Sequence, residues 1–308
     1  MNQLSRPKLH IRVIFAWFSL TLLSVSFIIC PAHACTLWAA IGRSTGHQAT
    51  LIAKNRDWSP DQYQELRFMA PAGGFKFLVL HPRGAVKPRD IAGVNEKGLV
   101  LVTAAASCIP RRERPESYYL EGFLNGLLAS CATVDEVIKK QGILSSPAFY
   151  LVADPAKIAL IEVGLNGKRS IKVMDNEVLA HTNHYLDKNL ADSNRKFNRG
   201  SYLRLFRIRY LLKSQGRPLT LEDFIRFSQD RYDGPDHSIL RKGSSPRQVH
   251  TLSTWIVSLP MGDSPRLYVR LRDPEGHEKV HLLKLDASFW AKRAPGALDL
   301  GKMGSGAR

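Results

Sequence analysis

After residue 34 the chain consists largely of short apolar runs bounded by glycine, proline, asparagine or aspartate, and this pattern constrains its fold more than any other feature. Runs of this length, with turn signals such as Asn166-Gly167 and Asp175-Asn176 between them, indicate β-strands. Gly46 and polar residues separate the first two runs, which predicts a hairpin. We expect strands at 35–42, 49–55, 75–80, 98–104, 148–153, 158–163, 171–173, 178–181, 252–258, 267–271 and 280–285.

Four other segments have helical patterns. Thr133 and Glu136 form a capping box at the start of one segment, and Thr220 caps another. We expect helices at 117–130, 133–140, 202–212 and from 221 to about 229. No internal repeat or low-complexity linker divides the chain, which favours one α+β domain over residues 35–293 with helices over strands. The glycine- and lysine-rich segment 294–308 is predicted to be a flexible tail.

Residues 1–34 have the features of a secretory signal peptide. Three basic residues precede an apolar segment over residues 13–29, and the A-x-A sequence Ala32-His33-Ala34 follows Pro31. We expect cleavage between Ala34 and Cys35 and export to the periplasm or the cell exterior. An uncleaved membrane anchor and a lipoprotein modified at Cys35 are the alternatives.

The formal net charge of the chain is +17, and loss of the three basic residues of the leader would lower it to +14. Such a charge is common in proteins that bind nucleic acid, but an exported protein meets anionic lipids and solutes first. The basic residues are also spread along the chain and do not form one block. We therefore expect no nucleic-acid partner and a weak attraction to the anionic envelope surface.

The number of cysteines left after removal of the leader would be odd, and Cys35 would be the first residue of the mature chain. Cys30 would leave with the leader, so the mature chain would keep Cys35, Cys108 and Cys131. Cys108 and Cys131 could form a disulfide in an oxidising compartment or remain as two buried thiols. In either case Cys35 is left over at the new N-terminus.

An N-terminal cysteine carries both a nucleophile and a base. The thiolate is the reactive form, and the α-amino group of the same residue, with a pKa of about 7.7–8.0, can accept the thiol proton near neutral pH. Removal of the leader would therefore create an active site at Cys35.

Four segments in order extend this hypothesis along the chain. They are Cys35-Thr36-Leu37-Trp38, Lys54-Asn55-Arg56-Asp57-Trp58, Gly93-Val94-Asn95-Glu96-Lys97-Gly98-Leu99 and His181-Thr182-Asn183-His184. Together they resemble the N-terminal-nucleophile (Ntn) cysteine hydrolases, a group with choloylglycine hydrolases, penicillin V acylases, acid ceramidases and acyl-coenzyme A:isopenicillin N acyltransferases. The resemblance runs from Cys35 to about Leu212 and less distinctly to Pro260. It implies an αββα four-layer sandwich in which the thiol attacks a linear amide carbonyl.

The resemblance also implies roles for three polar residues. Asp57 matches the acid that binds the α-amino group of the cysteine, and a carboxylate beside an amine supports the charged form of that amine. Asn183 and Asn95 match the residues of the oxyanion hole, where side-chain amides donate to the developing charge. Without the resemblance, both asparagines would be turn residues and Asp57 an exposed turn residue.

Two basic positions complete the resemblance. Arg204, in Ser201-Tyr202-Leu203-Arg204, matches a catalytic-site arginine, and Arg195 is the competing alignment. Lys54 occupies a position where the family usually has arginine. Lysine keeps the positive charge but lacks the planar guanidinium that could grip substrate at two points.

Metal and cofactor chemistry have little support in the sequence. His181 and His184 are three residues apart, but no third ligand and no H-E-x-x-H motif accompany them, so we expect no metal. The sequence also lacks the G-x-S-x-G, phosphate-loop and dinucleotide-binding motifs, and we expect no cofactor.

The sequence thus predicts an exported cysteine amidohydrolase. Cys35 would be acylated by a small-molecule N-acyl amide, the amine would leave, and water would release the acid. Transfer of the acyl group to another amine is the second chemistry of the same family. A non-enzymatic envelope lipoprotein that binds anionic ligands is the alternative from a different class. The sequence specifies neither the acyl chain, nor the amine, nor the oligomeric state.

Overall fold

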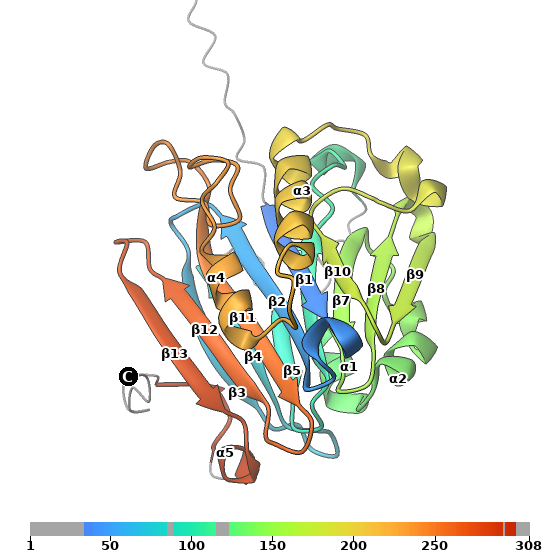
Figure 1. The fold of residues 1–308 in the computed structure, drawn as a ribbon, viewed down its shortest axis with the longest axis vertical. Coiled ribbons are helices and arrows are strands. Elements are labelled where there is room, and N and C mark those ends of the chain that lie inside the picture. Colours follow the sequence, from blue (N-terminus) through green and yellow to red (C-terminus); the bar gives the residue numbers. More distant parts are fainter. Residues whose placement is uncertain (1–33, 85–88, 115–122, 292, 300–308) are drawn as a thin grey trace, which may run out of the picture. The chain divides into compact units, whose positions relative to one another are not determined.

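Two antiparallel sheets form the centre of the fold (Figure 1). The computed structural model describes residues 34–84, 89–114, 123–291 and 293–299, all within one unit of the chain. Sheet A has the strand order β10-β1-β2-β11-β12-β13, and sheet B has the order β14-β3-β4-β5-β6-β7-β8-β9. Sheet A consists of β1 (Ala34–Ala40), β2 (Ala49–Trp58), β10 (Val178–His181), β11 (His250–Pro260), β12 (Arg266–Arg272) and β13 (Glu278–Lys284). Sheet B consists of β3 (Tyr63–Met69), β4 (Phe77–Arg83), β5 (Ala92–Asn95), β6 (Val100–Ala105), β7 (Ala148–Ala153), β8 (Ile158–Val163), β9 (Arg169–Met174) and β14 (Gly296–Ala297).

Helices cover the outer faces of both sheets. Apolar residues of α1 (Phe123–Ser130) and α2 (Val134–Lys139) are clustered with sheet B, and those of α3 (Arg199–Lys213) and α4 (Leu221–Ser228) with sheet A. Figure 1 shows α3 and α4 in front of the strands of sheet A. Short 3-10 helices lie at Gly42–Thr45, Arg111–Glu113, Gln141–Ile143, Leu165–Gly167 and Lys188–Ser193. The layers therefore follow the order helix, sheet, sheet, helix.

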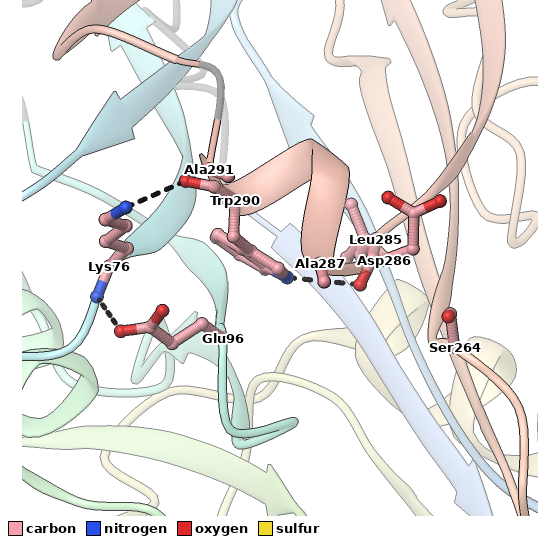
Figure 2. A pocket seen from close by; sticks show the side chains of 8 residues that line it. All are labelled: Lys76, Glu96, Ser264, Leu285, Asp286, Ala287, Trp290 and Ala291. Atoms are coloured by element: carbon pink, nitrogen blue, oxygen red, sulfur yellow. Dashed lines mark hydrogen bonds between the residues drawn. The ribbon is translucent and has the colours of Figure 1, made fainter.

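A fifth helix, α5 (Ala287–Ala291), follows β13 and lies at the bottom of Figure 1. Trp290 packs against Phe68 of β3, and its indole Nε1 donates a hydrogen bond of 3.1 Å to the carbonyl of Leu285. Lys76 Nζ donates to the carbonyl of Trp290 at 3.0 Å, and Lys76 N–H donates to Glu96 Oε1 at 2.9 Å (Figure 2). A cavity of about 380 Å³ lies among these residues.

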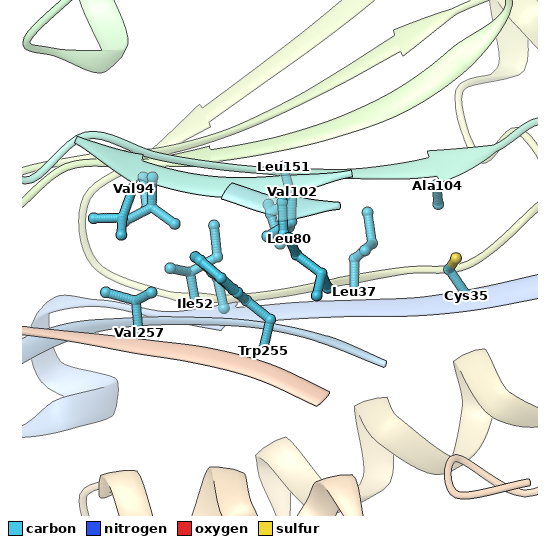
Figure 3. Packing of buried hydrophobic residues seen from close by; sticks show 14 of the residues in the cluster. Cys35, Leu37, Ile52, Leu80, Val94, Val102, Ala104, Leu151, Trp255 and Val257 are labelled. Carbon is cyan, nitrogen blue, oxygen red and sulfur yellow. The ribbon is translucent and has the colours of Figure 1, made fainter. Parts of the chain in front are cut away.

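The main core lies between the two sheets. Leu37, Ile52 and Trp255 of sheet A face Leu80 and Val102 of sheet B, and all are fully buried (Figure 3). Burial of each such side chain contributes about 1.5–3 kcal/mol to folding. Cys35 lies at one end of this row, with its sulfur directed toward the strand that carries Ala104 (Figure 3). The nucleophile predicted from the sequence is therefore at the end of the inter-sheet core.

The register of the predicted β1–β2 hairpin decides which side chains share a face. Cys35 is paired with Arg56, and Leu37 with Lys54. Residues directly opposite each other in an antiparallel pair project to the same side, and successive residues alternate. Cys35, Lys54 and Arg56 therefore belong to the face toward sheet B, whereas Asp57 belongs to the face toward α3 and α4.

Cys108 and Cys131 lie on opposite faces of sheet B. Cys108 belongs to the core between the sheets, and Cys131 belongs to the cluster under α1 and α2. Both are buried free thiols, which answers the question of a disulfide that the sequence left open. Burial raises the pKa of the Cys108 thiol to about 12, so this thiol is protonated at neutral pH.

Most elements agree with the sequence prediction, and the differences have local causes. The strands expected at 148–153, 158–163 and 178–181 have those bounds in the structure. β3 was missed because polar and apolar residues alternate only from Glu65 to Phe68, and β5 was missed because it is only four residues long. Gly296 and Ala297, within the predicted flexible tail, pair with Phe68 and Arg67 as β14.

Three expectations concern segments that lie wholly or partly outside the described residues. The predicted leader falls there except for Ala34, the first residue of β1, and so do residues 117–122 of the first predicted helix and residues 300–308. Within the described part of the chain, no helix is long and apolar enough to cross a membrane.

Candidate active site

Cys35 lies beside two buried basic side chains. Its Sγ is 3.5 Å from Nζ of Lys54, which also donates a hydrogen bond to the carbonyl of Thr103 on β6. Burial lowers the pKa of the Lys54 amine, and the Cys35 thiol opposes this effect. Burial also lowers the pKa of Arg56 to about 10, so this guanidinium stays charged at neutral pH. Nearby positive charge stabilises a thiolate, and the position suits a nucleophile.

Asn183 contacts the backbone of the same cysteine. Its Oδ1 accepts hydrogen bonds from Cys35 N–H at 2.8 Å and from Arg204 Nη2 at 3.1 Å. Its Nδ2 donates to the carbonyl of Ala105 at 2.9 Å. The structure therefore brings together three residues that are far apart in the sequence, Cys35, Asn183 and Arg204.

A buried hydrogen bond between Glu162 and His181 supports the segment that carries Asn183. His181 Nε2 lies 2.8 Å from Glu162 Oε1 on the neighbouring sheet, and neither side chain is appreciably exposed. The carboxylate also accepts hydrogen bonds from the N–H groups of Leu186 (2.7 Å) and Asp187 (2.9 Å). Burial alone would raise the pKa of Glu162, but these hydrogen bonds and His181 hold it below its usual value. The ionised carboxylate thus fixes the chain on both sides of Asn183.

Ser201, at the start of α3, fixes the segment from the other side. Its Oγ accepts a hydrogen bond of 3.0 Å from Asn183 N–H and is hydrogen-bonded to His184 Nδ1 at 2.7 Å. The His184 ring stacks on Tyr202 with 3.9 Å between the ring centroids. Burial, with His181 and Arg209 nearby, lowers the pKa of His184 to about 4, so the ring is neutral at pH 7.

Asp57 is fully buried between two arginines. Its Oδ1 accepts a hydrogen bond of 2.7 Å from Thr251. Its Oδ2 lies 3.8 Å from Arg204 Nε and 4.0 Å from Arg241 Nη1, and no residue that the structure describes donates a hydrogen bond to it. Burial raises the pKa of this carboxyl, while the two arginines and Thr251 act in the opposite direction. Asp57 Oδ2 therefore has room to accept a hydrogen bond from a further donor.

The two candidate arginines differ clearly in position. Arg204 is 1% exposed and contacts both Asn183 and Asp57, whereas Arg195 is 52% exposed and faces Glu113. Burial lowers the pKa of Arg204 to about 10, which leaves it charged at neutral pH. The structure thus places Arg204, and not Arg195, at the site.

Sequence reasoning missed Arg241. It lies in the loop between α4 and β11, where its N–H donates to Thr251 Oγ1 at 2.8 Å. Nothing in the sequence distinguishes it from the other basic residues of this loop, because its role depends on the long-range approach of the loop to β2.

Asn95 does not join the other predicted site residues. Its Nδ2 donates to the carbonyls of Leu128 and Cys131, and its Oδ1 accepts from the N–H groups of Lys97 and Leu99. It precedes the start of β6 at Val100, whereas Lys54 and Asn183 contact Thr103 and Ala105, about 10 Å and about 17 Å further along that strand at 3.3 Å per residue. The side chain organises a turn beneath α1, and the expected part in an oxyanion hole has no support in this geometry.

The remaining features of the structure do not change the choice of site. The cavity beside α5 contains none of the predicted site residues, and most of the polar groups drawn in Figure 2 are already paired. A second cavity, of about 190 Å³, is lined in part by Arg241.

No cluster of three potential metal ligands occurs in the described ranges, and the ring of His181 is bonded to Glu162.

Comparisons with known proteins agree with the predicted fold. Residues 44–275 match the family model of acyl-coenzyme A:6-aminopenicillanic acid acyl-transferase. Two structures of conjugated bile acid hydrolase from Clostridium perfringens, both of mutants, have 14% sequence identity, with alignments covering 86% of this chain and 96% of theirs and TM-scores of 0.51 and 0.49. No curated protein sequence matches the chain. At 14% sequence identity, the likeness to the bile acid hydrolase structures shows the fold alone, which is the αββα sandwich of the Ntn hydrolases. The matched family range begins after Cys35, so it does not test the nucleophile.

Proposed function

Since this chain belongs to the acyl-coenzyme A:6-aminopenicillanic acid acyl-transferase family, we propose that it is an exported cysteine amidohydrolase with Cys35 as its N-terminal nucleophile. The observation that carries the proposal is the surroundings of Cys35. Its thiol lies 3.5 Å from the buried Lys54 amine, and its backbone nitrogen is held by Asn183. Both atoms of the proposed nucleophile–base pair are thus positioned by polar groups at the end of the inter-sheet core.

The register explains how cleavage would complete the site. Ala34 is paired with Asp57, and Cys35 with Arg56. Hydrolysis of the Ala34–Cys35 bond would leave a free α-amino group next to Asp57, whose Oδ2 has no donor among the described residues. A carboxylate at this position would orient the amine and favour its protonated form. In the precursor the same nitrogen belongs to an amide and cannot accept a proton, so the precursor would be inactive.

In the proposed reaction the α-amine takes the proton of the Cys35 thiol, and the thiolate attacks the carbonyl carbon of an N-acyl amide. The tetrahedral intermediate collapses when the α-ammonium returns the proton to the departing amine. Water then attacks the thioester, with the α-amine as base, and releases the acid. Lys54 and Arg56 stabilise the thiolate that both steps require.

Acyl transfer is the second candidate, because the family model is named for a transferase. The two reactions share the acyl-enzyme on Cys35 and differ only in whether water or an amine attacks it. Product analysis with and without an added amine such as hydroxylamine would separate them. A hydrolase forms mainly the acid, whereas a transferase forms mainly the new amide at low amine concentration.

The first experiment is to purify the exported protein, determine its N-terminus and intact mass, and assay it against a panel of N-acyl amides. We expect a free Cys35 terminus and release of the acid. Cys35→Ser should lower kcat/KM by about 10³-fold or more, since removal of a catalytic nucleophile has effects of this size or larger. Cys131→Ala, at another buried free thiol, is the matched control and should keep most of the activity.

Three results would contradict the proposal. They are an N-terminus at Met1 or several residues beyond Cys35, a diacylated Cys35 as in a lipoprotein, and wild-type activity of Cys35→Ser on the best substrate.

A further inference from the structure

The cavity beside Arg241 has an unusual concentration of positive charge. Its volume is about 190 Å³, and it lies between the loop after α4 and the strands β12 and β13 of sheet A. The lining residues are Arg241, Lys242, His250, Arg270, Arg272, Gly276 and Glu278. Four of them are arginine or lysine, and Glu278 is the single carboxylate in the lining.

Two buried guanidinium groups in this lining have N–H groups without an acceptor. Arg270, with 6% side-chain exposure, donates from Nε and Nη2 to Glu278 at 2.9 Å each, but its buried Nη1 has no partner among the described residues. Arg241, with 10% side-chain exposure, likewise has a buried Nε that nothing in the described part of the chain satisfies. Buried charged donors are costly to leave unpaired, so these groups indicate a missing acceptor.

Three carboxylates lie near the cations of the cavity. Asp57 Oδ2 lies 4.0 Å from Arg241 Nη1, but it is also 3.8 Å from Arg204 Nε and is shared between the two arginines. Glu278 is held by the two-point contact with Arg270. Asp236 lies near Arg241 and His250 and accepts a hydrogen bond of 3.0 Å from Ser244 N–H. The cations of the cavity therefore exceed the carboxylates available to them.

One wall of the cavity is fixed by close packing. Gly243 has φ of 65°, and a Cβ at this position would lie 2.7 Å from Cε1 of His250. His250 Nδ1 is hydrogen-bonded to the carbonyl of Gln248 at 2.8 Å. Burial and the nearby Arg272 and Arg241 lower the pKa of His250, so its ring is neutral at pH 7. The positive charge comes from the arginines and Lys242.

We propose that this cavity, at Arg241, Lys242, Arg270 and Arg272, binds a tetrahedral oxyanion with two negative charges, a phosphate or sulfate group. Such a group offers several acceptors in different directions, and guanidinium groups bind it with charge-assisted hydrogen bonds. The volume of about 190 Å³ is below the usual ~300–1,000 Å³ of sites for drug-sized ligands, which suits a small anion or the phosphate end of a larger molecule. The lining does not include Cys35, although Arg241 also faces Asp57, and occupancy of the site can be measured without any substrate.

The test is isothermal titration calorimetry of the mature full-length protein with inorganic phosphate, sulfate, glycerol 3-phosphate and acetate at constant ionic strength. Saturable binding of phosphate or sulfate is the expected result. Arg272→Gln and Lys242→Gln should each weaken phosphate binding at least about tenfold, because each removes one cation from the lining. Arg266→Gln removes the same charge from the same strand outside the lining and should leave binding unchanged.

The calorimetric results either support or overturn the proposed phosphate or sulfate site. The absence of saturable phosphate and sulfate binding, or equal weakening in all three variants, would overturn the proposal, and so would acetate binding as tight as phosphate binding. If glycerol 3-phosphate binds more tightly than phosphate, the physiological ligand carries its phosphate as an ester; the reverse order identifies the free anion. Circular dichroism and the unfolding temperature without anion show whether the variants are folded.

Discussion

At the scale of single residues, Lys54 is the side chain whose removal is most informative. Its Nζ lies 3.5 Å from the Cys35 sulfur and also donates to the carbonyl of Thr103. Lys54→Met removes the charge that stabilises the thiolate, and we expect kcat/KM to fall about 10²-fold, as for loss of one electrostatic contact in an active site. The rate at which iodoacetamide alkylates Cys35 at pH 7 should fall as well.

Lys76→Met is the matched control for this experiment. Lys76 Nζ also donates to a backbone carbonyl, that of Trp290, but it lies beside α5 and away from Cys35. It should change stability without changing the alkylation rate. Equal alkylation rates in Lys54→Met and wild type would show that Lys54 does not act on the thiol.

The site residues also show what a sequence can and cannot predict about a site. Cys35, Asp57, Asn183 and Arg204 could be selected because each lies in a short recognisable motif, and the structure brings them together. Asn95 also lies in a local motif, but its amide groups bond the turn that it organises beneath α1, away from Cys35. A local sequence pattern shows which residue is present, but it does not show which hydrogen-bond partners that residue has in the folded chain.

At the scale of elements, the connection from β10 to the following 3-10 helix depends on one carboxylate from β8. Glu162 bonds His181 and the N–H groups of Leu186 and Asp187. Glu162→Ala removes the acceptor of the buried His181 ring and of the part-buried N–H groups of Leu186 and Asp187, and we expect the free energy of unfolding to fall by about 1–3 kcal/mol, as for buried polar groups left without a partner. Urea denaturation measures this loss, with Glu177→Ala on the exposed part of the same region as the control. A loss no greater than that of the control would refute the role given to Glu162.

The other support of Asn183, at the start of α3, predicts a pH dependence of stability. The pKa of His184 is about 4 in the folded protein, below its ordinary value of about 6.5. Between these values the unfolded chain binds a proton that the folded chain does not, so stability falls as pH decreases from about 6.5 to 4. His184→Gln should make the free energy of unfolding less dependent on pH in this window. The slopes of wild type and variant between pH 4 and 7 test this; identical slopes would mean that His184 titrates normally.

The elements that the sequence predicted well are those whose pattern is decided locally. The runs at 148–153 and 158–163 are apolar enough to be read as strands without knowledge of their neighbours, and they form β7 and β8. β14 consists of Gly296 and Ala297, and neither residue type favours strands. It exists because β3 offers a free edge, and such an edge is known only after the sheet is assembled.

At the scale of the whole molecule, the α-amine is the base that export would create, and this makes the N-terminus testable as part of the mechanism. If the amine of Cys35 accepts the thiol proton, kcat/KM should rise with pH through a limb near the ordinary amine pKa of about 7.7–8.0. Asp57 shifts this limb upward, while Lys54 and Arg204 shift it downward. Because the amine and the thiol of Cys35 are in contact, their protons titrate as a coupled pair. The pKa of the rising limb therefore describes the pair and is not assigned to one group.

The decisive variant adds one residue ahead of Cys35, by replacement of the leader with a single alanine that is not removed. That alanine would take the place of Ala34, paired with Asp57 in the register of β1 and β2. The nitrogen of Cys35 would then remain an amide, hydrogen-bonded to Asn183 and unable to accept a proton. We expect kcat/KM to fall at least about 10³-fold although Cys35, Lys54 and the fold are intact, because the base is lost and the nucleophile stays. Mass spectrometry must confirm the extra residue, and circular dichroism the fold. Full activity of the extended protein would assign the proton transfer to another group, and Lys54, whose pKa is lowered by burial and whose amine contacts the sulfur, would be the first to test.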